Sequence, residues 1–335
     1  MEYAGSYALF NYRLADPGRG LEPSNVRLIR AFEHGLDPAS SEAGFVLVHI
    51  DMVRHSGDLV SGTCACLDAS AARDRAALNR GLRAVLAALT QVNAVMDTMW
   101  HRSKPRAYTS FRTFIFGITA QSMFPDGVVY EGVSDQPLRF RGESGANDSM
   151  VPLVDNLLQI PMPDTPLTDI LKDFRDYRPS NHRQFLAWVR SRSLEAGVKA
   201  FALDRGHGDG DGDGDGDGKG DGSVTESRQL WLLVLNQVRD FRWRHWCFAK
   251  EYILKNTGHP TATGGSPIVT WLPNQLGAVL EEMAAIYEDI TGGPRPEPER
   301  LGRECQDVMD VVYRQRATLA KEVHKYCAER SVGEM

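Results

Sequence analysis

Apolar residues recur with the period of an α-helix along most of this chain. Between residues 76 and 100 they fall at every third or fourth position for about seven turns. Between residues 225 and 255 the same spacing produces a single stripe of Leu230, Val234, Val238, Phe241, His245, Phe248 and Tyr252. Side chains spaced in this way share one face of a helix. Shorter helices are predicted at 167–174 and 182–194, and further helices at 42–60 and 297–328, the last of them highly charged. The strand signal at 127–130 is weak, so the pattern predicts an all-α fold.

The chain is expected to form one main helical domain over residues 41–335, with residues 1–40 as a small N-terminal segment packed on it. Within the main domain, Gly and Asp alternate over residues 206–222. Glycine is entropically costly to order and neighbouring aspartates repel one another, so we predict a disordered surface loop there. Calcium binding is the alternative, although the run lacks the glutamate that supplies the twelfth position of an EF-hand loop.

Charge and composition exclude several classes of protein. The chain carries 38 Lys and Arg against 44 Asp and Glu, a formal net charge of −6. Nearly all of this excess lies in the Asp/Gly run, so no strongly basic surface remains for a nucleic acid. Neither an apolar run of membrane length nor a signal peptide is evident, and we expect a cytoplasmic protein that does not enter a membrane. Five cysteines without a CxxC pair argue against a disulfide framework and against structural zinc.

Two histidines, His49 and His245, lie on apolar helix faces. Each is either a hydrogen-bonded core residue or a ligand, since a neutral imidazole on a rigid helix can bind a haem iron axially. Four aromatic residues near His245 would supply flat apolar walls: Phe241, Trp243, Trp246 and Phe248. The spacing alone does not separate haem from zinc or from plain packing. Arg112, in an aromatic-rich segment, is either an ion-pair partner or a bidentate clamp for a carboxylate.

Several motifs occur in a characteristic order. They are FRTFIFG (111–117), DGVVYEG (126–132), RGESGAN (141–147), YRPSNHRQFL (177–186), FRWRH (241–245) and TGG (263–265). In this order, from about residue 44 to residue 280, the chain resembles the indoleamine 2,3-dioxygenase family. That family is part of a haem oxygenase superfamily that also contains tryptophan 2,3-dioxygenase.

The resemblance implies an all-helical domain with haem b bound axially through the iron ligand His245. It places Phe241 beside the haem, and Ser144 in a loop near both the haem edge and the substrate. It also implies that Arg112 binds the substrate carboxylate and that Phe45 packs on the substrate ring. The loop residues Thr263 and Gly264 would contact the amino-acid end of the substrate. The spacing just before Arg112 is one residue shorter than in the family, so Tyr108 is only the nearest candidate for a second ring-packing aromatic.

His49 departs from the family pattern. Indoleamine dioxygenases usually carry a small residue such as serine at this distal position, whereas tryptophan 2,3-dioxygenases place a histidine against the indole N–H. The resemblance therefore gives His49 a catalytic role, either orienting an indole or donating a hydrogen bond to the bound oxygen.

The resemblance implies a haem-dependent oxygenase that uses O2 to cleave the C2–C3 bond of L-tryptophan or a substituted tryptophan. The product would be of the N-formylkynurenine type. One alternative is a monooxygenase in a natural-product pathway that forms a 2-oxindole or hydroxylates an aromatic amino acid. Another is a non-catalytic haem sensor or carrier. The expected partners are the aromatic amino acid, O2 and an electron donor that keeps the haem ferrous; a homo-oligomer is neither predicted nor excluded.

Overall fold

The computed structural model describes residues 10–115, 117–118, 122–140, 148–162, 176–203, 219–258, 268–292 and 301–332. Within these residues the fold is all-α, as predicted. The helices are α1 (Ser41–Val53), α2 (Ser56–Ala71), α3 (Arg75–Asp97), α4 (Met99–Arg102), α5 (Pro105–Ile115), α6 (Met150–Leu158), α8 (Ser180–Glu195), α9 (Val198–Leu203), α10 (Lys219–Phe248), η4 (Ala249–Leu254), α11 (Ile268–Thr291) and α12 (Gly302–Arg330). In the described part of the chain, no helix is long and apolar enough to cross a membrane.

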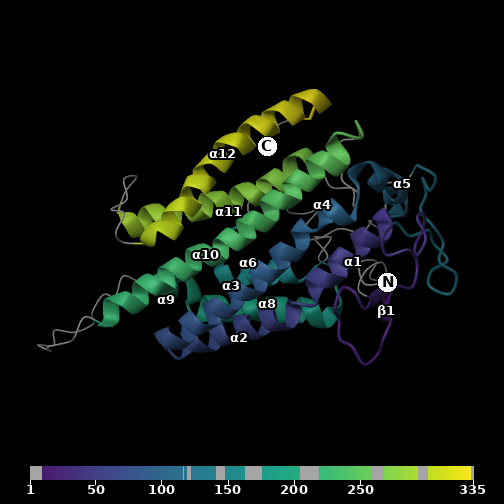
Figure 1. The fold of residues 1–335 in the computed structure, drawn as a ribbon. Helices are drawn as coiled ribbons and strands as arrows, with labels where there is room; N and C mark the ends of the chain where they lie inside the picture. The colour runs from purple at the N-terminus through teal and green to yellow at the C-terminus, as the bar shows by residue number, and fades with distance from the viewer. Residues whose placement is uncertain are drawn as a thin grey trace, which may run out of the picture.

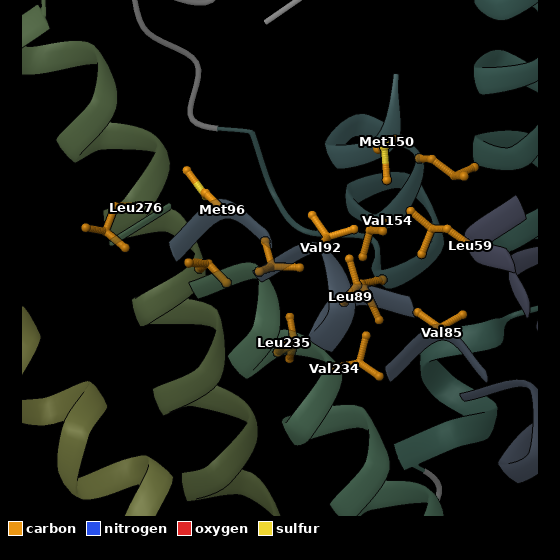
Figure 2. Packing of buried hydrophobic residues seen from close by; sticks show 14 of the residues in the cluster. Leu59, Val85, Leu89, Val92, Met96, Met150, Val154, Val234, Leu235 and Leu276 are labelled. Atoms are coloured by element: carbon orange, nitrogen blue, oxygen red, sulfur yellow. The ribbon is translucent and has the colours of Figure 1, made fainter. Parts of the chain in front are cut away.

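Helix α3 lies at the centre of the core, packed between α2 and α10. Small residues allow the close approach of α2 and α3: a Cβ on Gly81 would lie 2.8 Å from the Cys66 Sγ. Figure 2 shows the apolar face of α3, with Val85, Leu89, Val92 and Met96, meeting side chains from α2, α6, α10 and α11. The period of residues 76–100 is thus the signature of a helix that is buried along one whole side.

Helices α10, α11 and α12 pack one on the next. In Figure 1 the long α10 runs across the molecule, and α12 is the outermost helix beyond α11. The seven-residue stripe of α10 turns inward, since Leu230, Val234 and Val238 are buried. A π-helical segment, η4, continues α10 directly, so the stripe extends to the buried ring of Tyr252.

The N-terminal segment is tied to the start of α1. It contains a two-stranded antiparallel sheet, β1 (Tyr12–Leu14) and β2 (Val26–Leu28). The buried carboxylate of Glu42 accepts backbone N–H bonds from Phe32, Glu33 and His34 at 2.6, 2.8 and 2.9 Å. Helix α1 also has an N-cap, because the Ser40 hydroxyl accepts the Ala43 N–H at 3.2 Å. Both contacts fix where α1 begins and how it is rotated.

Some predicted elements were wrong in detail. The helix expected over 42–60 is two helices, which break between Val53 and Ser56. Helix α10 begins at Lys219, earlier than the expected start at residue 225 and inside the expected Asp/Gly loop. Helix α11 was not predicted; it contains Pro273. The weak strand signal at 127–130, by contrast, was rightly given little weight, since this segment is a connector with an isolated bridge between Val128 and Leu138. The helix expected at 167–174 and residues 206–218 of the loop lie outside the described residues.

Candidate active site

Helix α1 presents Phe45 and His49 on one face, because residues four apart lie one turn above each other. Their ring centroids are 4.6 Å apart. The Nδ1 of His49 lies 2.8 Å from the carbonyl oxygen of Phe45. A carbonyl can only accept, so Nδ1 carries the proton, and in the neutral ring Nε2 is an acceptor. Burial lowers the pKa of His49 and favours this neutral form.

Close packing with α4 sets the position of this face. A Cβ built on Gly44, the residue before Phe45, would lie 1.9 Å from the backbone oxygen of Arg102. Only glycine fits this approach, which brings the α1 backbone directly against the end of α4. The sequence Gly44–Phe45 thus combines a residue that packs helix on helix with one that faces the site.

Helix α5 contributes Tyr108, Phe111 and Arg112. The Phe45 ring lies 5.3 Å from that of Tyr108 and 5.8 Å from that of Phe111, and Tyr108 also meets Tyr252 of η4 at 5.7 Å. These rings form one aromatic cluster in which α1, α5 and η4 meet. Arg112 is buried, only 5% exposed, and burial lowers the pKa of its guanidinium while the nearby Tyr108 raises it. A buried guanidinium beside an aromatic cluster suits an amino-acid carboxylate.

His245 lies near the C-terminal end of α10, four residues before η4. Burial, followed by electrostatic interaction with His49, lowers the pKa of His245 to about 4. The ring is therefore neutral at pH 7, and the electrostatic interaction indicates that the imidazoles of α1 and α10 lie near enough to influence each other. Both rings are surrounded by protein yet keep part of their surface accessible. No hydrogen bond joins the His245 ring to any residue that the structure describes.

Ion pairs fix the helix that carries His245. Arg242 donates to Asp155 of α6 at 2.7 Å and to the Gln275 carbonyl of α11 at 3.0 Å. Arg244 donates to Asn93 of α3 at 2.8 Å and lies 3.2 Å from Asp97. These contacts lie on both sides of α10 and fix its rotational orientation about its own axis.

Sequence reasoning missed a partly buried carboxyl group that interacts with His49. Asp148 precedes α6, and its carboxylate accepts the Met150 N–H at 2.7 Å. Burial raises the pKa of this carboxyl, against the effects of backbone hydrogen bonds and of Arg178 and His49. Arg178 is itself buried and donates to the Asp148 carbonyl at 2.9 Å. Asp148 directly follows the RGESGAN motif and Arg178 lies within the YRPSNHRQFL motif, but they are 30 positions apart and follow no helical period that would pair them.

A family model of the indoleamine 2,3-dioxygenases matches residues 1–276 of this protein. The chain belongs to the indoleamine 2,3-dioxygenase family. It is 26% identical over 192 residues to the indoleamine 2,3-dioxygenase 1 of Rattus norvegicus, covering 56% of this chain and 46% of the relative. It is 27% identical over 184 residues to the human indoleamine 2,3-dioxygenase 2, covering 55% and 44%. The chain thus spans about half the length of these curated relatives, and the resemblance seen in the motifs is confirmed at the level of the family.

A further relative carries a different name. The chain is 32% identical over 123 residues to a protein named myoglobin from Haliotis madaka, covering 36% of this chain and 32% of that protein. Proteins similar to members of this family are therefore known under both a dioxygenase and a myoglobin name.

The structure brings together most of the residues that the family motifs indicated. Phe45, His49, Tyr108 and Arg112 come together through α1 and α5, and the interaction between the two histidines links them to His245. The predicted loop residues are outside the described residues: Ser144, Thr263 and Gly264. Their roles stay predictions.

Of the four aromatic residues expected to form walls around His245, two share its face of the helix and two point elsewhere. Phe241 and Phe248 lie four residues before and three after His245, so they share its face of the helix. Trp246 points elsewhere, since its indole N–H donates to Glu322 of α12 at 2.7 Å. Trp243 lies against the ammonium group of Lys250, 5.6 Å from the ring centroid. Adjacent residues on a helix point about 100° apart, so sequence proximity to His245 did not place these indoles beside it.

Proposed function

We propose that this protein binds haem b through His245 and uses O2 to oxidise the indole ring of L-tryptophan or a substituted tryptophan. The observation that carries the proposal is the cluster of Phe45, His49 and Tyr108 on α1 and α5, which adjoins the buried Arg112 and whose histidine interacts electrostatically with the neutral His245 of α10. Membership of the indoleamine 2,3-dioxygenase family supports the same reaction class.

The residues present fit a haem. His245 is neutral and lies on a helix held by ion pairs, and neither ring nitrogen is hydrogen-bonded to a described residue, so the nitrogen that carries no proton would be available to bind the iron. Phe241 lies on the same face and would pack beside the macrocycle. When bound, the haem supplies the activation of O2, for which amino-acid side chains have no equivalent chemistry. The protein supplies position and a largely water-excluded space.

The substrate would be held at both ends. The Arg112 guanidinium would bind the carboxylate, and Phe45 would pack on the indole ring. Nε2 of His49 is an acceptor in the neutral ring, so it would receive the indole N–H. The described tautomer thus favours the first of the two roles expected for His49, orientation of the indole, over donation to oxygen. Ser144, Thr263 and Gly264 remain proposed contacts of the haem edge and of the amino-acid end.

We further propose that oxidation proceeds by dioxygenative C2–C3 cleavage to an N-formylkynurenine-type product, with an external electron donor keeping the iron ferrous. A monooxygenase forming a 2-oxindole or hydroxylated amino acid would use the same pocket. A second function, reversible O2 binding, draws support from the similarity to the Haliotis madaka protein named myoglobin. Arg112 argues against it, because a buried clamp for a carboxylate has no use in an O2 carrier.

One experiment separates these functions. The haem-loaded ferrous protein is mixed with L-tryptophan under 18O2, and the product is analysed by mass spectrometry alongside the absorption spectrum. A Soret band and the gain of two labelled oxygen atoms would support the dioxygenase. Gain of one atom would replace it by the monooxygenase. A stable oxygenated spectrum without turnover of any aromatic amino acid would favour the carrier. A His245→Ala protein that keeps the same haem spectrum would refute the axial assignment.

A further inference from the structure

Helix α12 lies beyond the 1–276 segment that matches the family model, yet it contacts the helix that carries His245. Its contacts are spaced about two turns apart along α12 and reach both α10 and the η4 segment that continues it. Gln315 of α12 accepts from Arg239 at 2.9 Å, and further along Glu322 accepts from Trp246. Near its end, Arg330 donates to the carbonyl of Leu254 at 2.7 Å. In Figure 1 α12 lies along the same side of the molecule as α10 and α11.

Glu322 makes the contact closest to the candidate iron ligand. Its carboxylate accepts the indole N–H of Trp246, the residue directly after His245, at 2.7 Å. Both carboxylate oxygens also bind the Lys250 ammonium, at 2.7 and 2.9 Å. Trp246 is fully buried, and its ring meets Tyr326 of α12 edge-on at 5.8 Å. A buried indole needs an acceptor for its N–H, and a charged acceptor is the stronger kind.

The same helix holds both ends of the π-helical segment. Lys250 lies at the start of η4, where its carbonyl accepts the Lys255 N–H at 3.0 Å in the i to i+5 pattern of a π-helix. Leu254 is the last residue of η4, and its carbonyl is bound by Arg330. Such segments are wider than an α-helix and often adjoin functional sites. Two side chains of α12 therefore fix the irregular turn that follows His245 and leads to Tyr252 of the aromatic cluster.

We propose that α12 acts as a clamp on the helix that carries the iron ligand, and that Glu322 is a positioning residue that sets the orientation of His245. This inference rests on the proposed haem function of His245. Glu322 acts through Trp246 and Lys250 and does not itself touch the site. Without it the buried indole N–H has no acceptor, so the end of α10 must rotate or loosen, and His245 turns with it.

The test compares Glu322→Ala and Glu322→Gln with a matched control, Glu281→Gln. Glutamine keeps an oxygen acceptor for Trp246 but loses the charge that holds Lys250. Glu281 pairs with Arg316, an exposed contact between α11 and α12, so its change removes a tether of α12 that does not reach α10. Each haem-loaded protein is reduced to the ferrous form, and the iron–histidine stretching band is measured by resonance Raman. Haem transfer to excess apomyoglobin gives the dissociation rate.

We expect Glu322→Ala to shift the iron–histidine band and to release haem about tenfold faster or more, the factor that corresponds to a lost charge-assisted hydrogen bond. Glu322→Gln should lie between, and the control should match the wild type. A Glu322→Ala protein with a lower Tm but an unchanged band and unchanged haem release would overturn the clamp and leave the haem site standing. A wild-type protein without any iron–histidine band would overturn the proposed function and this inference together.

Discussion

Replacing Gly44 by alanine tests whether the approach of α1 to α4 positions the site. The added Cβ would lie 1.9 Å from the Arg102 oxygen and 2.6 Å from its carbonyl carbon, whereas Cβ contacts essentially never fall below 3.0 Å. Both close atoms belong to the backbone, so no side chain can move aside to make room. The two helices must therefore separate by about 1 Å, the difference between 1.9 and 3.0 Å.

The expected cost follows from that displacement. Overpacking of this kind destabilises by roughly 1–3 kcal/mol, and the higher helix propensity of alanine offsets about 1 kcal/mol of it. Phe45 and His49 move with α1, and a misplacement of about 1 Å in a positioned group can reduce the rate roughly 100-fold. We expect Gly44→Ala to lower the free energy of unfolding by about 0–2 kcal/mol and to reduce kcat/KM much more than haem content.

Urea unfolding and steady-state kinetics measure the two effects. Gly277→Ala is the matched control: it lies within α11, and nothing is within 4 Å of its added Cβ. It should be stabilised by about 0.5–1 kcal/mol with unchanged kinetics, because alanine is the better helix former. If Gly44→Ala were as stable and active as Gly277→Ala, the close approach of α1 and α4 could not be what positions Phe45 and His49.

Three further substitutions test individual groups. Arg112→Lys keeps the charge but loses the planar guanidinium, so the Kd for L-tryptophan should rise about tenfold or more at unchanged haem content. The control is Arg106→Lys, a change at an exposed position of the same helix, which should leave the Kd unaltered. Equal affinities in both variants would show that Arg112 does not bind the substrate carboxylate. His49→Ala should abolish discrimination between L-tryptophan and its 1-methyl analogue, which lacks the indole N–H; a ratio of affinities equal to that of the wild type would refute the hydrogen bond. Arg178→Ala removes the donor to the Asp148 carbonyl and the positive charge near the carboxyl of that residue. The free energy of unfolding, measured in urea, should therefore fall by about 1–3 kcal/mol. An unchanged free energy would mean that the pair contributes nothing to stability.

Helical periodicity predicted the elements that are buried along one continuous face. Helix α3 repeats its apolar face over its whole length, and the stripe of α10 continues into η4. The break between α1 and α2 has no such signal, because residues 54–55 contain neither proline nor glycine and apolar residues continue on both sides. Helix α11 was missed for the opposite reason, since Pro273 and Gly277 normally mark helix ends. Tertiary packing against α10 and α12 overrides these local preferences.

The residue pairs of the candidate site also fall into two groups, those within one helix, which the sequence predicted, and those joined by helix packing, which it did not. Spacing of four residues placed Phe45 with His49 and Phe241 with His245, since such pairs depend only on one helix. The contacts of Glu322 with Trp246 and of Arg178 with Asp148 join residues 76 and 30 positions apart. No local pattern relates such residues, because their meeting depends on how whole helices pack. The error over Trp243 and Trp246 has the same origin, since closeness in sequence was taken as closeness in space.

The contrast between the two histidines separates a packing role from a functional one. A core histidine without function is expected to have its nitrogens hydrogen-bonded, because an unpaired buried polar group is costly. His49 meets half of this expectation: Nδ1 binds the Phe45 carbonyl, which fixes the ring and leaves Nε2 as an acceptor. His245 makes no hydrogen bond to the described residues, although its helix is fixed by Arg242 and Arg244. A rigid, neutral imidazole without a hydrogen-bond partner among the described residues, in electrostatic interaction with a second imidazole, is poorly explained by packing. It is the arrangement expected where a ligand completes the bonds that the described residues do not make.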